Sequence, residues 1–180
     1  PSNLLLDSCE IKDGKYFLKG SISQAQSGLL FFDMKPEYQT LGASMVSIFI
    51  EPQDMKVYSE LKNVKKTLKI TSAPINEAIG MYNDYLNSLP EKKQVSELNG
   101  KIQVAFSEAR MDEVRVLSRA RDSLQMVLID RLFAHDPQAT RSPAAAYLVS
   151  QLAASLDVQQ RGEIVEKFDT ALTDSYYLNG

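Results

Sequence analysis

Hydrophobic residues in the first 70 positions follow the short runs and alternations that are typical of β-strands. Asp13-Gly14 predicts the turn of a hairpin, because both residues tolerate the positive φ angles of a two-residue loop. The face of this hairpin that we expect to be buried holds Cys9, Ile11, Tyr16 and Leu18. The opposite face is mostly charged.

Four more strands are predicted before the pattern changes. Residues 29–32 and 46–50 are nearly continuous apolar runs, so we expect both strands to be central and covered on two sides. Residues 55–58 and 67–70 alternate, which predicts one solvent-facing side on each strand. Residues 33–44 form a long connection, either a functional loop or a disordered one.

After Ser72 the hydrophobic period becomes helical. A single stripe down one predicted helix holds Ile75, Ile79, Tyr82 and Leu86. Pro90 either ends this helix or begins the next. Residues 91–134 predict one long bent helix or two helices, with Asn99-Gly100 as the candidate interruption.

Local capping signals organise the remainder of the chain. Ser142 followed by Pro143 predicts the start of a helix, since serine is a good N-cap and proline suits the first helical position. Asp157 with Gln160 predicts a capping box at the start of another helix. One last helix is predicted to be lined by Ile164, Phe168 and Leu172.

This order of elements predicts an α+β fold, without βαβ alternation or internal repeats. Residues 1–72 are expected to form an antiparallel β-sheet or small β-sandwich. Residues 73–180 are expected to form a helical subdomain that packs on it, because two nearly continuous apolar strands need cover.

Composition narrows the classes of function. The chain has 180 residues, 44% hydrophobic and 24% charged, which is enough for a core without a disulfide or metal. The net charge is −3 and the isoelectric point about 5.3. The densest basic run, residues 62–66, is interpreted as the solvent-facing side of a strand, so we expect no nucleic-acid partner. No apolar run reaches the length of a membrane span. The sequence begins at Pro1, and we expect that its natural start has been trimmed.

Few residues are candidates for chemistry. Cys9 is the only cysteine and is predicted to be a buried, inert side chain, while His135 is the only histidine and is predicted to be a polar residue near a helix end. We expect no metal site and no cofactor, since zinc, calcium and nucleotide motifs are not found in the sequence. Residues 108–121 mix charges at helical spacing, which is typical of a solvated helix face. Tyr176 and Tyr177 are candidate interface residues.

Several segments together resemble a domain family of unknown function. Residues 7–20, DSCEIKDGKYFLKG, resemble its "DS-x-x-V-x-DG-x-F-x-F-x-G" hairpin. Residues 48–57 are similar to its next strand pair, and residues 71–76 resemble its "GS-x-x-N" motif, with Thr71 where glycine is usual. Residues 136–148 resemble its late "P-x-S-x-A-A-x-x-L" helix start. This family lies ahead of thioredoxin-like thiol–disulfide oxidoreductases of the bacterial cell envelope.

The resemblance implies a non-catalytic accessory module of the periplasm or outer surface, within a lipid-anchored protein. A downstream thioredoxin-like domain would carry the Cys-x-x-Cys pair that this chain lacks. The module would position partners or mediate subunit contacts, by binding a protein or by self-association. The alternative is a stand-alone cell-surface scaffold that recognises a peptide or glycan through residues 33–44 or the sheet face. A self-contained hydrolase is the third hypothesis, and it requires a cleft with converging acids.

Overall fold

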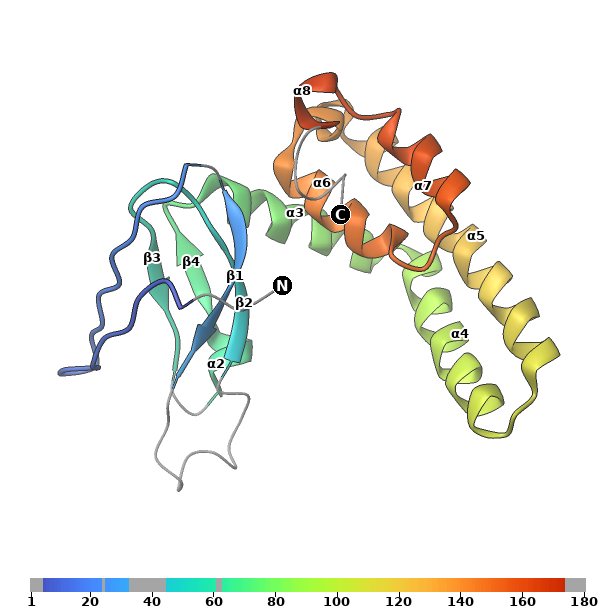
Figure 1. The fold of residues 1–180 in the computed structure, drawn as a ribbon, viewed down its shortest axis with the longest axis horizontal. Helices are drawn as coiled ribbons and strands as arrows, with labels where there is room; N and C mark the ends of the chain where they lie inside the picture. Colours follow the sequence, from blue (N-terminus) through green and yellow to red (C-terminus); the bar gives the residue numbers. More distant parts are fainter. Residues whose placement is uncertain (1–4, 24, 33–44, 61–62, 174–180) are drawn as a thin grey trace. The chain divides into compact units, whose positions relative to one another are not determined.

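The computed structural model describes residues 5–23, 25–32, 45–60 and 63–173. The chain divides into two units, Pro1–Ala73 and Pro74–Gly180. The first holds two small antiparallel sheets and the second is helical, so the fold is α+β, as predicted (Figure 1).

Two separate strand pairs form the N-terminal unit. One sheet pairs β1 (Gln26–Phe31) with β2 (Met45–Ile50), and the other pairs β3 (Lys56–Tyr58) with β4 (Lys69–Thr71). The predicted strands are therefore found, but the expectation that β1 and β2 are covered on both sides is wrong. Leu30 and Val46 are buried on one face. On the other face Leu29, Phe31 and Met45 are exposed, and Phe49 near the end of β2 is the large side chain that is buried among the described residues.

The turn at Asp13-Gly14 is confirmed, but the hairpin strands around it are not. Both residues have positive φ, 50° and 72°, and Lys12 bridges Lys15 with two backbone hydrogen bonds of 2.9 Å. No ladder continues beyond that bridge in the described arms. Instead the Asp7 carboxylate accepts a 2.7 Å hydrogen bond from the Lys19 backbone, so a side chain replaces a ladder partner.

The basic run contains a helical turn rather than a strand. Helix α2 (Val64–Thr67) buries Val64, and β4 begins only after it. The Thr67 hydroxyl donates to the Asn63 carbonyl (2.9 Å) and accepts from the Glu60 backbone (2.8 Å). These two hydrogen bonds hold the turn closed and explain why the predicted strand over 67–70 starts later.

Helices make up the C-terminal unit (Figure 1). Their bounds are α3 Pro74–Ser88, α4 Pro90–Ser107, α5 Met111–His135, the 3₁₀ helix η2 Pro137–Arg141, α6 Pro143–Ala153, α7 Val158–Val165 and α8 Thr170–Thr173. The predicted stripe of α3 faces the core, with Tyr82 and Leu86 buried. Pro90 begins α4 rather than ending α3.

Residues 91–134 form two helices, and the break is not at Asn99-Gly100. Helix α4 continues through that pair and ends where Ala109 adopts a φ of 56°. The Arg110 backbone donates to the Ala105 carbonyl (2.9 Å) and the Ala109 backbone to the Phe106 carbonyl (3.1 Å). This pair of hydrogen bonds is a Schellman motif, with alanine at the left-handed position that glycine usually occupies.

The predicted caps of the later helices are confirmed. The Ser142 hydroxyl accepts from the Ala145 backbone, and Asp157 with Gln160 forms a complete capping box. The predicted last helix is wrong, because α7 ends at Val165 and α8 starts at Thr170. Between them the Asp169 backbone donates to the Thr140 carbonyl at 3.0 Å, a long-range hydrogen bond that takes the chain out of helical geometry.

The core of the C-terminal unit lies among α3, α5, α6 and α7. Leu128, Ile129 and Leu132 of α5 are fully buried. Residues 144–146 of α6 are alanines and are all buried, which lets this helix approach its neighbours closely. Helices α4 and α5 lie side by side as an antiparallel pair, and their connecting loop is at the end away from α6 (Figure 1).

Candidate functional site

Cys9 is exposed, so the prediction of a buried thiol is wrong. The arm around it forms no strand, and Ile11 and Leu18 are also exposed. Of the predicted inner face only Tyr16 is partly buried, with its ring edge-on to Phe32 at 5.8 Å. Burial raises the pKa of the Tyr16 phenol, and the nearby Cys9 thiol adds to that rise. One thiol without a second cysteine offers no disulfide chemistry within the chain.

His135 lies at the C-terminal end of α5, as predicted, and its ring is exposed. It stacks on Tyr85 with ring centroids 3.8 Å apart and planes 7° from parallel. The neighbouring Asp136 accepts hydrogen bonds from the Tyr82 hydroxyl (2.7 Å) and the Gln138 backbone (2.9 Å). The Tyr82 hydrogen bond is the larger cause that lowers the pKa of Asp136. This cluster connects α3 to the turn before η2, and its carboxylate is occupied by structural hydrogen bonds.

A second polar cluster, which the sequence patterns did not single out, joins α5 to the end of α6. Ser155 Oγ lies 2.7 Å from Gln125 Oε1 and 3.0 Å from Asp122 Oδ1, and Gln125 is buried. Arg121 pairs with the same carboxylate at 2.8 Å. The basic group that contacts this serine's partner Asp122 is the Arg121 guanidinium, which does not accept protons. The cluster therefore orients side chains and does not make a nucleophile with a base.

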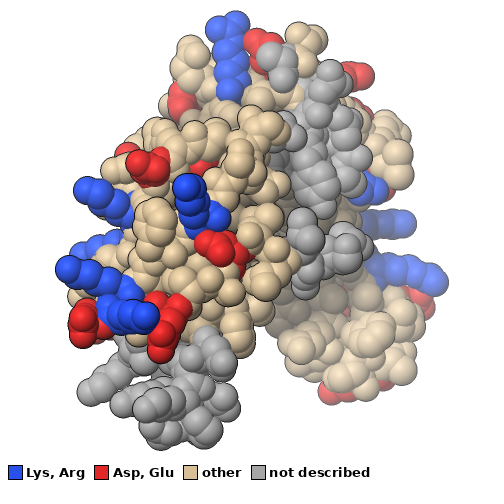
Figure 2. Space-filling model, turned by 60° about the vertical axis from the view of Figure 1, so that its left-hand side comes forward, with Lys and Arg blue, Asp and Glu red and all other residues tan. Residues whose placement is uncertain are grey.

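Metal-ligating residues are not gathered anywhere in the described part of the chain. No group of three or more His, Cys, Asp or Glu side chains lies close enough there to hold an ion. On the side of the molecule shown in Figure 2, basic side chains lie singly or beside acidic ones, with uncharged residues between them. Across the described residues, none of the helices combines the length and apolarity that crossing a bilayer demands.

Three apolar side chains project from one face of the β1–β2 sheet. Phe31 and Met45 are directly opposite each other in the ladder, and Leu29 precedes Phe31 by two residues, so all three share a face. Their exposed fractions are 63%, 50% and 53%. We name these three residues the outer sheet face. The alternation of side chains along β1 explains this exposure, because Leu30, which lies between Leu29 and Phe31, points into the core.

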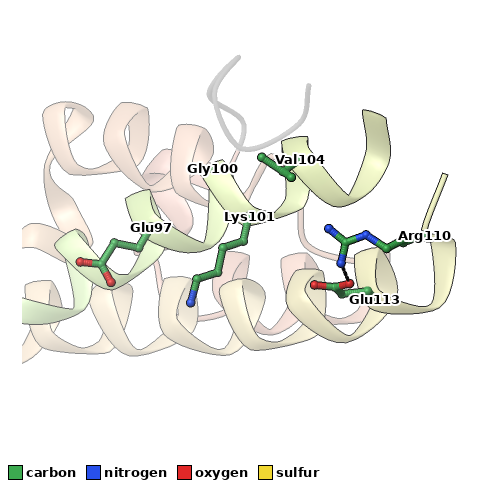
Figure 3. A pocket seen from close by; sticks show the side chains of 6 residues that line it. All are labelled: Glu97, Gly100, Lys101, Val104, Arg110 and Glu113. Atoms are coloured by element: carbon green, nitrogen blue, oxygen red, sulfur yellow. Dashed lines mark hydrogen bonds and ion pairs between the residues drawn. The ribbon is translucent and has the colours of Figure 1, made fainter. Parts of the chain in front are cut away.

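A shallow groove of about 450 Å³ lies along one side of the α4–α5 pair (Figure 3). Its lining residues are Glu97, Gly100, Lys101, Val104, Arg110 and Glu113. Arg110 pairs with Glu113 in the first turn of α5 and with Glu108 at 2.7 Å. Farther along α5, Arg115 pairs with Asp112 at 3.1 Å. These pairs confirm the predicted solvated charged face over residues 108–115, whereas Arg121 at its far end is only 18% exposed and pairs with Asp122. The sequence does not predict the groove itself.

Two predicted sites lie outside the described residues. They are the interface pair Tyr176 and Tyr177 and the long connection over residues 33–44.

Comparisons with known proteins give one match. A search of curated proteins and a search of solved structures each found nothing similar to the chain. Residues 136–148, which also resemble the family's late helix start, lie outside the residues that the family model matches. Residues 2–79, which comprise nearly all of the N-terminal unit and the start of α3, match the family described as a domain of unknown function (DUF4369).

Proposed function

We propose that this chain is a non-catalytic interaction module whose N-terminal unit binds a protein partner through the outer sheet face. The observation that carries this proposal is the exposure of Leu29, Phe31 and Met45, each at least 50% exposed on one face of a regular sheet. Contiguous exposed apolar side chains on a sheet are typical of interaction surfaces. The hydrogen bonds of the two polar clusters support a structural role for the residues that most resemble catalytic groups.

The size of the outer sheet face favours a tethered partner. Complete burial of a large apolar side chain stabilises by roughly 1.5–3 kcal/mol, and these three are about half buried already, so covering them contributes about 3 kcal/mol. Association of two free proteins costs at least about 4 kcal/mol. A partner in the same polypeptide or assembly avoids most of that cost because its effective concentration is high.

A downstream thioredoxin-like domain fits this requirement. Under this proposal the chain is the front part of an envelope thiol–disulfide oxidoreductase, lipid-anchored, in the periplasm or on the outer surface. The support is the resemblance of residues 7–20 and the match of residues 2–79 to a family of unknown function. The module would hold the substrate protein or a second subunit while the downstream domain supplies the Cys-x-x-Cys pair.

The alternative is a stand-alone cell-surface domain that recognises a peptide. The favouring observation is that β1 and β2 pair only with each other among the described strands, which leaves sheet edges for an added peptide strand. The outer sheet face carries one aromatic residue and two aliphatic ones, which suits a peptide better than a glycan.

The test uses the full-length protein and the Phe31→Ser/Met45→Ser double variant. We expect the KM for a protein disulfide substrate to rise several-fold, while reduction of a small disulfide is unchanged. Val158→Ser is the control for loss of an exposed apolar side chain, because Val158 is even more exposed than Phe31 and Met45 but lies on α7. The interaction role is refuted if the double variant behaves like the control in this assay and in binding to every partner of the full-length protein. Turnover of a substrate by the purified 180-residue chain would refute the non-catalytic assignment.

A further inference from the structure

Gly100 lies within α4, on the side that faces the groove. A Cβ added at this position would meet nothing within 4 Å, so the fold of this chain does not require glycine there. Glycine inside a helix destabilises it, and its compensating use is to let another backbone approach closely.

The groove is lined mainly by charged side chains, and an exposed valine lies in it or beside it on each helix. Val104 of α4 lines it and is 51% exposed. Val116 follows the lining residue Glu113 by one turn of α5, which places it on the same side of that helix, and it is 66% exposed. These two exposed valines give each helix an apolar position that a further helix can cover.

Two opposite charges frame Gly100. Glu97 and Lys101 both line the groove, and Figure 3 shows them projecting from the same stretch of α4. In the part of the chain that the structure describes, no carboxylate lies within 4.0 Å of the Lys101 ammonium, and the contact of Glu97 is a marginal 4.0 Å pair with Lys93. Both charges are therefore open to an external partner.

We propose that this side of the α4–α5 pair binds a second copy of the chain, with α4 antiparallel to its equivalent. A two-fold axis midway between Glu97 and Lys101 brings Glu97 beside Lys101 of the second copy, and the same contact is repeated by symmetry. Gly100 then lies about 1.5 Å along the helix from the axis, where the two backbones are closest. Helix α4 is complementary to itself in charge and in shape at this point.

The residues of the groove favour a second copy of the chain over a different partner. A different partner would need its own acid and base at matching positions, whereas the copy supplies them at the required spacing. Arg110 at the end of the groove is already paired with Glu113 and with Glu108, so these charges are satisfied within the chain. The proposal does not depend on the function proposed for the N-terminal unit.

Sedimentation equilibrium of the 180-residue chain tests the proposal, at concentrations up to about 100 µM, which detects weak specific dimers. We expect a monomer–dimer equilibrium. Gly100→Leu should raise the dimer dissociation constant at least roughly tenfold by blocking the approach of the backbones, although leucine is the better helix former. Gly162→Leu on α7 is the matched control, because Gly162 is also a helical glycine with open space around its Cβ position.

Charge reversal distinguishes contacts between copies from contacts within α4. Glu97→Lys alone and Lys101→Glu alone should each weaken the dimer, because each reversal puts like charges together twice. An equimolar mixture of the two single variants should form a heterodimer, and the double variant should dimerise again. An intrahelical effect of these residues would not give recovery in the mixture.

The proposal is overturned if the chain is monomeric throughout this range. It is equally overturned if a dimer persists unchanged in Gly100→Leu, or if mixing the two charge variants gives no heterodimer. The Phe31→Ser/Met45→Ser variant should dimerise normally, so failure of the proposed N-terminal function and failure of this dimer are measured separately.

Discussion

Tyr82→Phe removes a single hydroxyl from the connection between α3 and the turn that follows α5. Tyr82 is buried, and its hydroxyl donates a 2.7 Å hydrogen bond to Asp136 Oδ2. The other oxygen of that carboxylate accepts from the Gln138 backbone at the start of η2. The substitution keeps the ring and its packing, so the change in the free energy of unfolding reports the polar contacts of the hydroxyl, chiefly the hydrogen bond to Asp136, together with a contact to the Ser142 side chain.

The expected loss is about 1.5 kcal/mol. Hydrogen bonds to charged groups contribute roughly 1.5–3 kcal/mol, and the lower end applies because Asp136 is only partly buried and water replaces part of the interaction. With a urea dependence of about 2 kcal/mol per molar, the midpoint of helix unfolding should fall by roughly 0.75 M at pH 7. Circular dichroism of the helical signal measures this midpoint.

The penalty should disappear in acid. The hydrogen bond from Tyr82 is the first cause that lowers the pKa of Asp136 in the folded chain, so the folded pKa lies below the unfolded one. The stabilisation is then present above the unfolded pKa and is lost as the pH falls through the folded pKa. The difference between the wild-type chain and Tyr82→Phe should be full at pH 7 and should shrink as the pH falls below about 3.9.

Tyr58→Phe is the control for removal of a phenolic hydroxyl, because Tyr58 is exposed on β3. It should change the free energy of unfolding by less than about 0.5 kcal/mol. The reasoning is refuted if Tyr82→Phe costs no more than this control. It is also refuted if the cost persists at low pH while the chain remains folded.

Three further predictions concern local structure. Ala109→Gly should raise the free energy of unfolding by about 1 kcal/mol, since Ala109 has a φ of 56° that glycine adopts without strain. Urea unfolding measures this change, and a loss of stability would contradict the Schellman assignment. Asp157→Ala should cost about 1 kcal/mol by removing the capping box of α7, whereas Asp157→Asn should retain most of the stability in the same assay. Cys9 should react with a thiol reagent almost as fast in the folded chain as in urea, and strong protection in the folded chain would show that the arm is covered.

Features determined by a few neighbouring residues were predictable from the sequence. The caps at Ser142 and Asp157 depend on one side chain and the backbone three residues later, and both are as predicted. The stripe of α3 was also found because its period over three turns is independent of what covers it. The positions of β1 and β2 follow from apolar content alone.

Features that depend on contacts between distant segments were not predictable. The Asn99-Gly100 pair has weak helix propensity, yet α4 continues through it because it packs along α5. The helix ends instead at Ala109. Glycine usually occupies this left-handed position, so the alanine gives no sign of the helix end in the sequence. The prediction for Cys9 is wrong because alternation around a turn predicts a backbone ladder between the two arms. The sequence does not show that the Asp7 side chain will accept a hydrogen bond from the opposite arm instead.

The candidate surfaces were missed for a related reason. The run over residues 29–32 has the same sequence appearance whether one or both faces of a strand are covered, and only the structure shows Leu29 and Phe31 exposed. The groove forms only because α4 packs beside α5, and the sequence does not show that packing. From the sequence alone, Gly100 therefore predicts a break in the helix. Its open Cβ position is a property of the folded helix pair.

The two proposed surfaces strengthen each other if both operate. The outer sheet face buries too little apolar area to hold a free partner, and the groove gives the chain no recognition of other molecules. A two-fold dimer through α4 carries two outer sheet faces, so a partner with two binding segments, or a dimeric partner, engages the second face at high effective concentration. Avidity then supplies the affinity that three half-buried side chains lack. Dimerisation in the C-terminal unit is therefore a physical condition for weak recognition in the N-terminal unit to act on partners that are not tethered.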